Sequence, residues 1–245
     1  TRLLESTLAR HLDALERLKV GDAPAVGAQI RALVAEALDL IRAVAHLREL
    51  TQRTRDDLIA TGEKLSVRLV TAALNAAGTA AEAVDADTFL ETDAAFGEAN
   101  ALMGICDRTI AAALRPVLER GEIAVVTGFC GRAPDGATTT LGRGGSDLSA
   151  TLIAAALRAD EVTIWTDVDG VFNADPRVVP GARVIRQLNF REAGEMSFYG
   201  AKVLHQRTMI PVASLGIPVR TRNSFAPEAE GTVIDGRITP GSHPV

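Results

Sequence analysis

TTTLGRGGSDLS, residues 138–149, is the stretch around which the chain is organised. Three hydroxyl residues lead into a turn that carries three glycines and one arginine, and the turn runs directly into an apolar segment with helical character. The glycines can adopt positive φ without a Cβ clash, so several backbone N–H groups can converge on one point. Ser146 or Asp147 is expected to cap the helix that follows.

A glycine turn that leads into a helix N-terminus is a general anion site, because unpaired N–H groups and the helix dipole both favour negative charge. Arg143 stands at the edge of this turn. Its guanidinium can bind a carboxylate through two parallel hydrogen bonds. The stretch therefore predicts a loop that holds an acidic substrate against a phosphate donor.

Composition narrows the class of protein. Hydrophobic residues make up 47% of the 245 residues and aromatic residues only 4%, which suits an Ala, Val, Leu and Ile core of helices on a parallel sheet. The net charge of −5, without a basic run, argues against a nucleic-acid partner. Apolar stretches are too short to span a membrane and no signal peptide is apparent. Two cysteines form no disulfide framework, so we expect a soluble, cytoplasmic protein.

The order of expected elements predicts an α/β protein. Two helices broken at 20–24 are expected in the first sixty residues, followed by a helix that starts at Thr61 or Gly62 and ends near Ala77. Further helices are expected at 101–120, 147–158, 190–196 and 203–215, and strands at 81–87, 123–127, 161–166, 217–221 and 231–234. Strands that alternate with helices, without an internal repeat, predict one domain with a mainly parallel open sheet.

Three expected strands end in polar turns, at 127–129, 166–170 and 220–223. Ligands of open parallel sheets bind at the carboxyl ends of the strands. Asp167 and Asp169 have two interpretations at this stage. They either stabilise a turn through Asx hydrogen bonds or bind magnesium, ribose or adenine.

Two charged residues also leave alternatives open. Glu63, in the expected first helical turn, either complements the helix dipole or receives a substrate ammonium group. Lys202 either starts a helix, where a cation is unfavourable, or contacts a ligand. Trp165 and Cys130 are expected in the core of the sheet.

Several motifs together resemble the catalytic domain of aspartate kinase, in the amino acid kinase family. They occur in the family's order and cover nearly the whole chain. The motifs are GEKLS (62–66), VTGF (126–129), TTTLGRGGSD (138–147), WTDVDGV (165–171), DPR (175–177) and GAKVLH (200–205). The RGGSD run (143–147) separates this kinase from other amino acid kinases.

The resemblance implies a three-layer αβα sandwich with an aspartate-binding part at about 1–150 and an ATP-binding part at about 151–245. It implies transfer of the γ-phosphoryl group of ATP, carried with Mg²⁺, to the β-carboxylate of L-aspartate. This reaction is the first step of lysine, threonine and methionine biosynthesis. It implies no metal site built from protein ligands.

The resemblance also assigns roles to residues. Arg143 pairs with a carboxylate of aspartate and Glu63 receives its amino group, while Ser146 and Asp147 lie at the junction with the phosphates. Because an ionised acceptor carboxylate needs no strong base, we expect Asp147, the second catalytic residue beside Arg143, to orient a lysine or magnesium. Further aspartate-site residues are Thr1, Phe129, Gly144, Gly145 and Ser146. The implied nucleotide contacts are Thr166, Asp167, Phe172, Arg177, Lys202 and Val203.

The chain departs from the family pattern in places. A first strand ending in a Lys-Phe-Gly-Gly loop and the C-terminal ACT domains have no counterpart, and Phe172 stands where tyrosine is usual. We therefore expect weak or no activity from this chain alone, and a homo-oligomer or a part of a larger multidomain enzyme. The alternatives are another carboxylate kinase of the same fold, or a truncated module that binds without catalysis.

Overall fold

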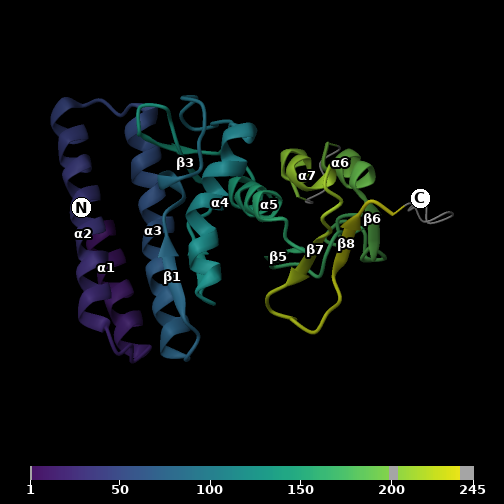
Figure 1. Cartoon of the computed structure of the whole chain (residues 1–245), viewed down its shortest axis with the longest axis horizontal. Helices are drawn as coiled ribbons and strands as arrows, with labels where there is room; N and C mark the ends of the chain where they lie inside the picture. The colour runs from purple at the N-terminus through teal and green to yellow at the C-terminus, as the bar shows by residue number, and fades with distance from the viewer. Residues whose placement is uncertain (1, 199–203, 238–245) are drawn as a thin grey trace. The chain divides into compact units, whose positions relative to one another are not determined.

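The computed structural model describes residues 2–198 and 204–237. The chain packs as two compact units, and the boundary between them lies within the glycine turn (Figure 1). One unit comprises residues 1–142 and the other residues 143–245. Within the described residues, no helix is long and apolar enough to cross a membrane.

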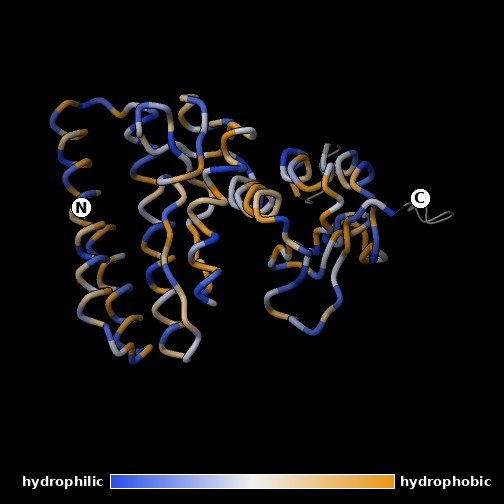
Figure 2. The backbone as a smooth tube through the Cα atoms, in the orientation of Figure 1, coloured by the Kyte–Doolittle hydropathy of each residue, from blue (hydrophilic) through white to orange (hydrophobic). Residues whose placement is uncertain are grey.

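Three long helices form the first part of unit 1: α1 (Arg2–Arg17), α2 (Ala23–Leu47) and α3 (Gln52–Ala76). They lie side by side, and the tube of Figure 2 alternates between orange and blue along α1 and α2, as expected of helices with one apolar face. The predicted break at 20–24 is confirmed, since α2 begins with Pro24 in its first turn. Their shared core contains Leu15, Ile30, Val34, Leu65 and Ala72.

The predicted start of the third helix at Thr61 or Gly62 is wrong. Thr51 caps α3 instead, and its hydroxyl accepts a hydrogen bond from the Thr54 N–H at 3.1 Å. Gly62 lies inside the helix and is exposed, and no packing neighbour lies within 4 Å of the position that a Cβ would take. A glycine at such a position lowers the stability of a helix only modestly, so the helix continues through it. Glu63 therefore lies in the middle of α3, and the interpretation that it complements the helix dipole is also wrong.

The rest of unit 1 contains two pairs of strands. β1 (Ala81–Val84) and β2 (Ile123–Val126) are parallel and are connected through a short 3₁₀ helix, η1 (Ala86–Thr88), and α4 (Met103–Glu119). The antiparallel pair β3 (Cys130–Arg132) and β4 (Thr138–Thr140) was not predicted. Both strands have three residues, and the threonines of β4 are all buried, so the segment has no apolar alternation that would indicate a strand.

Unit 2 contains a four-stranded sheet in the order β5–β7–β8–β6. Its strands are β5 (Val162–Thr166), β6 (Gln187–Asn189), β7 (Val219–Asn223) and β8 (Thr232–Asp235), and its helices are α5 (Gly145–Leu157), α6 (Phe190–Phe198) and α7 (Gln206–Ala213). β5–β7 and β6–β8 are parallel pairs, whereas β7–β8 is antiparallel. The predicted α/β class is confirmed; the three-residue strand β6 was not predicted.

The start of α5 differs from the prediction. Gly144, at φ 69°, is the residue before the helix and no side chain caps it. Ser146 and Asp147 lie inside the first turn, so the prediction that one of them caps the helix is wrong. The left-handed glycine starts the helix earlier than a hydroxyl or carboxylate cap would. The predicted start of α7 at Val203 lies outside the described residues; its N-cap is His205.

A buried carboxylate fixes the strand that enters the glycine turn. Asp56 of α3 is only 1% exposed and accepts hydrogen bonds from the Gly97 N–H at 2.8 Å, the Thr140 N–H at 2.9 Å and the Thr140 hydroxyl at 2.9 Å. The Ala99 N–H in turn donates to the Thr140 carbonyl at 2.8 Å. One side chain of α3 thus joins the 97–99 loop to β4.

We expect the Asp56→Ala change to lower the free energy of unfolding by about 2–4 kcal/mol, because it leaves buried donors unpaired. Urea denaturation followed by circular dichroism measures this loss. Asp57→Ala is the matched control, since Asp57 is the next residue of α3 and only partly buried. Equal stability of the two variants would contradict a structural role for Asp56.

Candidate functional site

A cavity of about 160 Å³ lies in unit 2 at the carboxyl end of β5. It brings Asp147, in the first turn of α5, together with Thr166, the last residue of β5. The first turn of α5 and the 166–170 turn therefore meet at one site. The residues that line the cavity are Asp147, Ile164, Trp165, Thr166, Val168, Gly170, Val171, Leu204 and Thr221.

Two parallel strand ends hold the turn beside this cavity. Thr166 of β5 is the register partner of Asn223 of β7. The Thr166 carbonyl accepts hydrogen bonds from the Ser224 N–H at 2.8 Å and hydroxyl at 2.9 Å, and the Asn223 amide donates to the Asp169 carboxylate at 2.7 Å. Asp169 thus has a partner on β7 that fixes the turn, and this is a tertiary hydrogen bond, not the local Asx bond of the sequence interpretation.

Gly170 allows the turn to approach β8 closely. A Cβ atom at Gly170 would lie 2.6 Å from the Thr232 hydroxyl oxygen, and the residue has a φ of 139°. The Thr232 hydroxyl accepts a hydrogen bond from the Val171 N–H at 2.8 Å and donates one to the Ile185 carbonyl at 2.6 Å. A buried hydroxyl group therefore helps to position the wall of the cavity after β5, together with the Ile185 N–H, which donates to the Val171 carbonyl at 2.8 Å.

Asp147 is the ionisable group among the described residues that line the cavity. It is half-buried, and burial raises the pKa of its carboxyl group above the usual value. No hydrogen bond or opposite charge among the described residues offsets this effect. A desolvated carboxylate at a helix start is suited to hold a cation, and Mg²⁺ bound to a nucleotide fits this donor set. Among the described residues no cluster of three or more His, Cys, Asp or Glu side chains could hold a metal ion, so the nucleotide phosphates and water would have to supply most ligands of Mg²⁺.

A second group of site residues lies in unit 1, around α3. Burial raises the pKa of Glu63, which is half-buried and has no hydrogen bond or opposite charge among the described residues to offset the effect. The adjacent Lys64 pairs with Asp87 at 2.6 Å, and the Thr138 hydroxyl donates to the same carboxylate at 3.0 Å. The unpaired Glu63 carboxylate is suited to receive a cationic group.

Two residues where the chain enters β3 have unusual environments. Phe129 adopts φ 69°, a left-handed conformation that is rare for a bulky residue and is often found at functional sites. Cys130 is fully buried, as predicted, and burial together with the carboxylates of Asp87 and Glu63 raises its thiol pKa to about 12. The thiol is therefore protonated at neutral pH and is no nucleophile.

The remaining predicted site residues are not among those that line the cavity. Arg143 and Ser146 are exposed and Gly145 is buried, while a Cβ at Gly144 would lie 3.0 Å from the His205 Cβ. Three predicted nucleotide contacts do not line the cavity. Asp167 is exposed, Phe172 pairs with Val184 in a β-bridge, and the Arg177 guanidinium binds Asp175 through two hydrogen bonds of 3.0 and 2.7 Å. Thr1, Lys202 and Val203 lie outside the described residues.

The cavity also contains residues that the sequence did not indicate. Trp165 is 50% exposed, so its predicted place in the sheet core is wrong. It belongs to β5 and is the register partner of Arg222 of β7, whose guanidinium lies 5.0 Å from the centre of the indole ring, while solvent reaches the rest of the side chain. Thr221 of β7 was missed because its alternating strand pattern gives no sign of a ligand. The position of Trp165 directly before the TDVDG run was the available signal.

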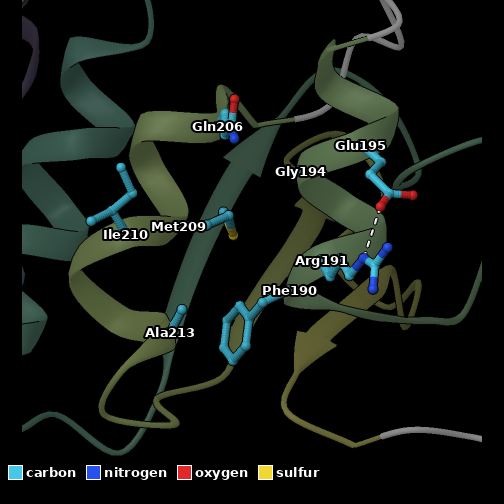
Figure 3. Close-up of a pocket in the computed structure, with 8 residues that line it drawn as sticks. All are labelled: Phe190, Arg191, Gly194, Glu195, Gln206, Met209, Ile210 and Ala213. Atoms are coloured by element: carbon cyan, nitrogen blue, oxygen red, sulfur yellow. Dashed lines mark hydrogen bonds and ion pairs between the residues drawn. The ribbon is translucent and has the colours of Figure 1, made fainter.

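A larger hollow of about 710 Å³ lies between α6 and α7 (Figure 3). Phe190, Met209 and Ala213 form its apolar side, and Arg191 binds Glu195 at 2.9 Å on its rim. It contains none of the predicted site residues, so the smaller cavity at β5 is the candidate site.

Comparison with known proteins identifies the family. The model of the amino acid kinase family matches residues 9–223. The chain therefore belongs to the amino acid kinase family, and the predicted family and fold are confirmed. The chain is 40% identical to aspartokinase 3, chloroplastic, of Arabidopsis thaliana over 91% of its own length, and 41% identical to lysine-sensitive aspartokinase 3 of Escherichia coli over 73%.

A solved structure matches over nearly the whole chain. It is E. coli aspartokinase III in complex with aspartate and ADP, which superposes on 97% of this chain with a TM-score of 0.90 and 34% identity. The chain covers 41% and 40% of the two relatives and 52% of the solved chain. It thus spans about half, or less, of the length of these proteins.

We expect the Gly170→Ala change to destabilise the protein by about 2–4 kcal/mol, since it combines an unfavourable φ with a clash against Thr232. Thermal denaturation compares it with Gly181→Ala, where a Cβ would meet nothing within 4 Å. A stable Gly170→Ala protein would show that the turn can move away from β8.

Proposed function

We propose that this chain is the catalytic part of an aspartate kinase. It transfers the γ-phosphoryl group of ATP to the β-carboxylate of L-aspartate and forms 4-phospho-L-aspartate, the entry to lysine, threonine and methionine biosynthesis. The observation that carries the proposal is the likeness, at a TM-score of 0.90 over 97% of the chain, to an aspartokinase in complex with aspartate and ADP. The RGGSD run and the cavity beside it support the proposal.

The chemistry requires positioning and charge compensation more than covalent assistance. Phosphoryl transfer passes through a loose transition state with charge on the equatorial oxygens. The acceptor carboxylate is already ionised at neutral pH, so the reaction needs no strong general base. The principal barrier is repulsion between two anions, and cations and helix-end N–H groups reduce it.

Each residue near the glycine turn has a role in this scheme. We assign to Arg143, which is exposed, the pairing with a carboxylate of aspartate. The N–H groups at the start of α5, reached through Gly144 and Gly145, accommodate negative charge. Mg²⁺ supplies charge compensation when it is bound with ATP, and Asp147 is the carboxylate suited to hold it. Ser146 lies in the same helical turn.

The substrate ammonium group requires an anionic partner. Glu63 is suited to this role, because its half-buried carboxylate has a raised pKa and gains an opposite charge when the ammonium group binds. Phe129, Thr1 and the predicted nucleotide contacts outside the cavity stay predictions. A homo-oligomeric state also stays a prediction. A cytoplasmic location stays one too, since several relatives are named as chloroplastic proteins.

A coupled assay tests the proposal by following ADP formation with L-aspartate, L-glutamate, N-acetylglutamate and UMP as acceptors. Hydroxylamine trapping identifies the acyl phosphate product. We expect activity with L-aspartate alone. Turnover confined to a different acceptor would assign the chain to another kinase of this family. If ADP and aspartate bind without turnover, the chain is a binding module, or requires a further segment of the enzyme.

We expect the Arg143→Ala change to raise the aspartate concentration needed for half-saturation roughly ten- to hundredfold, with little effect on ATP. This corresponds to ~1.5–3 kcal/mol for a charge-assisted pair. Steady-state kinetics, or calorimetry with aspartate if turnover is low, measures the shift. Arg191→Ala is the control, since Arg191 is exposed and forms only a surface ion pair. A loss of thermal stability without a change in aspartate binding would make Arg143 structural.

A further inference from the structure

His205 lies against the glycine turn. Gly144, the residue before α5, has a φ of 69°, and a Cβ atom at this position would lie 3.0 Å from the His205 Cβ and 3.8 Å from its Cγ. The Thr208 hydroxyl oxygen would lie 3.9 Å away. The backbone of the turn therefore packs directly on the first residues of α7, with little room for a side chain between them.

The His205 side chain determines where α7 begins. Its Nδ1 atom accepts a hydrogen bond from the Arg207 N–H at 3.3 Å, and its carbonyl accepts one from the Thr208 N–H at 2.8 Å. Such an N-cap satisfies an N–H group that has no partner within the helix. Because Nδ1 accepts, the neutral ring carries its proton on Nε2. The cap thus holds the ring, as well as the backbone, beside Gly144.

Helix α7 is tied to α5 by a shared core. Met209 and Val212 of α7 are buried in one apolar cluster with Ala154 of α5, and Thr208 is 0% exposed. Protein interiors are close-packed, so a shift at the start of α7 displaces whatever packs against it. Gly144 is in contact with this start, and we expect the glycine turn to move with it.

The conformation of Gly144 sets the direction of the first N–H groups of α5. The Leu148 N–H donates to the Gly144 carbonyl at 3.0 Å, which closes the first turn of the helix. The N–H groups of Gly145, Ser146 and Asp147 come before this bond, so helix geometry gives them no partner within α5. Glycine has wide backbone freedom, and it keeps one left-handed conformation only when its neighbours restrict it. The start of α7 provides this restriction.

We propose that His205 is a positioning residue for the phosphate donor, an assignment that rests on the proposed kinase function. The cap on α7 holds the surface against which Gly144 packs, and this keeps the first N–H groups of α5 directed at the phosphates. Hydrogen-bond donors that are already in place need no reorganisation when negative charge arrives. In this role His205 itself contacts neither the donor nor the acceptor, and the reaction uses no proton of its ring.

A His205→Ala change removes the cap and the ring but keeps the Cβ atom that packs against Gly144. We expect ADP and inorganic tripolyphosphate to bind about three- to tenfold more weakly, in line with the free energy of one N-cap. Adenosine, which carries no phosphate, should bind as before. Isothermal titration calorimetry with the three compounds measures these affinities. A general loss of structure would weaken adenosine as much as ADP, so the comparison separates positioning from folding.

Two amide substitutions at His205 form a matched pair. The oxygen of asparagine is among the best N-cap acceptors, whereas glutamine places the same amide one carbon further from the helix. We expect His205→Asn to restore ADP and tripolyphosphate affinity to within about twofold, and His205→Gln to behave like His205→Ala. His46→Ala is the control for the loss of an imidazole, since His46 is exposed in the last turn of α2.

Three results would overturn the positioning role and leave the proposed function intact. The first is equal ADP affinity in the unchanged chain and in His205→Ala. The second is an equal loss of affinity for adenosine and ADP. The third is equal ADP affinity in His205→Asn and His205→Gln, a comparison that remains available if His205→Ala does not fold. Absence of ADP binding by the unchanged chain would overturn the proposed function and this role with it.

Discussion

A single buried carboxylate organises the approach to the glycine turn. Asp56 replaces the water that the N–H groups of Gly97 and Thr140 would otherwise bind, and it also pairs with the Thr140 hydroxyl. A buried carboxylate is tolerated only when hydrogen bonds replace its hydration. Since β4 ends two residues before Gly142, the direction in which the chain enters the turn depends on this side chain of a distant helix.

Unit 2 uses a neutral group for the same purpose. The Thr232 hydroxyl joins Val171 to Ile185, and Gly170 lets the chain pass close to it. Neither hydrogen-bonding arrangement appears as a sequence motif, because each depends on one residue that is distant in the sequence from the turn it positions. Both place a turn at a strand end, where parallel sheets bind ligands. Site geometry here therefore follows from isolated polar groups in the interior more than from the loops themselves.

The sequence predicted the elements that have a regular hydrophobic spacing or a short local motif. The amphipathic helices, the β1–β2 and β5–β7 strands and the glycine turn were all indicated by spacing or composition. The predicted start of α3 at Thr61 or Gly62 was wrong, because an exposed glycine is tolerated inside a helix and Thr51 is the better N-cap. β3, β4 and β6 were missed because three residues show no period. The meeting of Asp147 and Thr166 followed from the rule for strand ends, whereas Thr221 came from tertiary packing alone.

The polar groups of the chain fall into two kinds. Lys64 and Asp87 satisfy each other, and so do the Asp56 carboxylate and its donors, so that these groups stabilise the free protein. Glu63 and Asp147 lose hydration without gaining a partner among the described residues. Such groups make the free protein less stable, and a ligand that pairs with them recovers the difference as binding free energy. Glu63 and Lys64 are adjacent on one helix, yet within the part of the chain that the structure describes only the lysine has a partner. We expect this contrast when structural side chains pair within the protein and ligand-binding side chains find their partner only in the ligand.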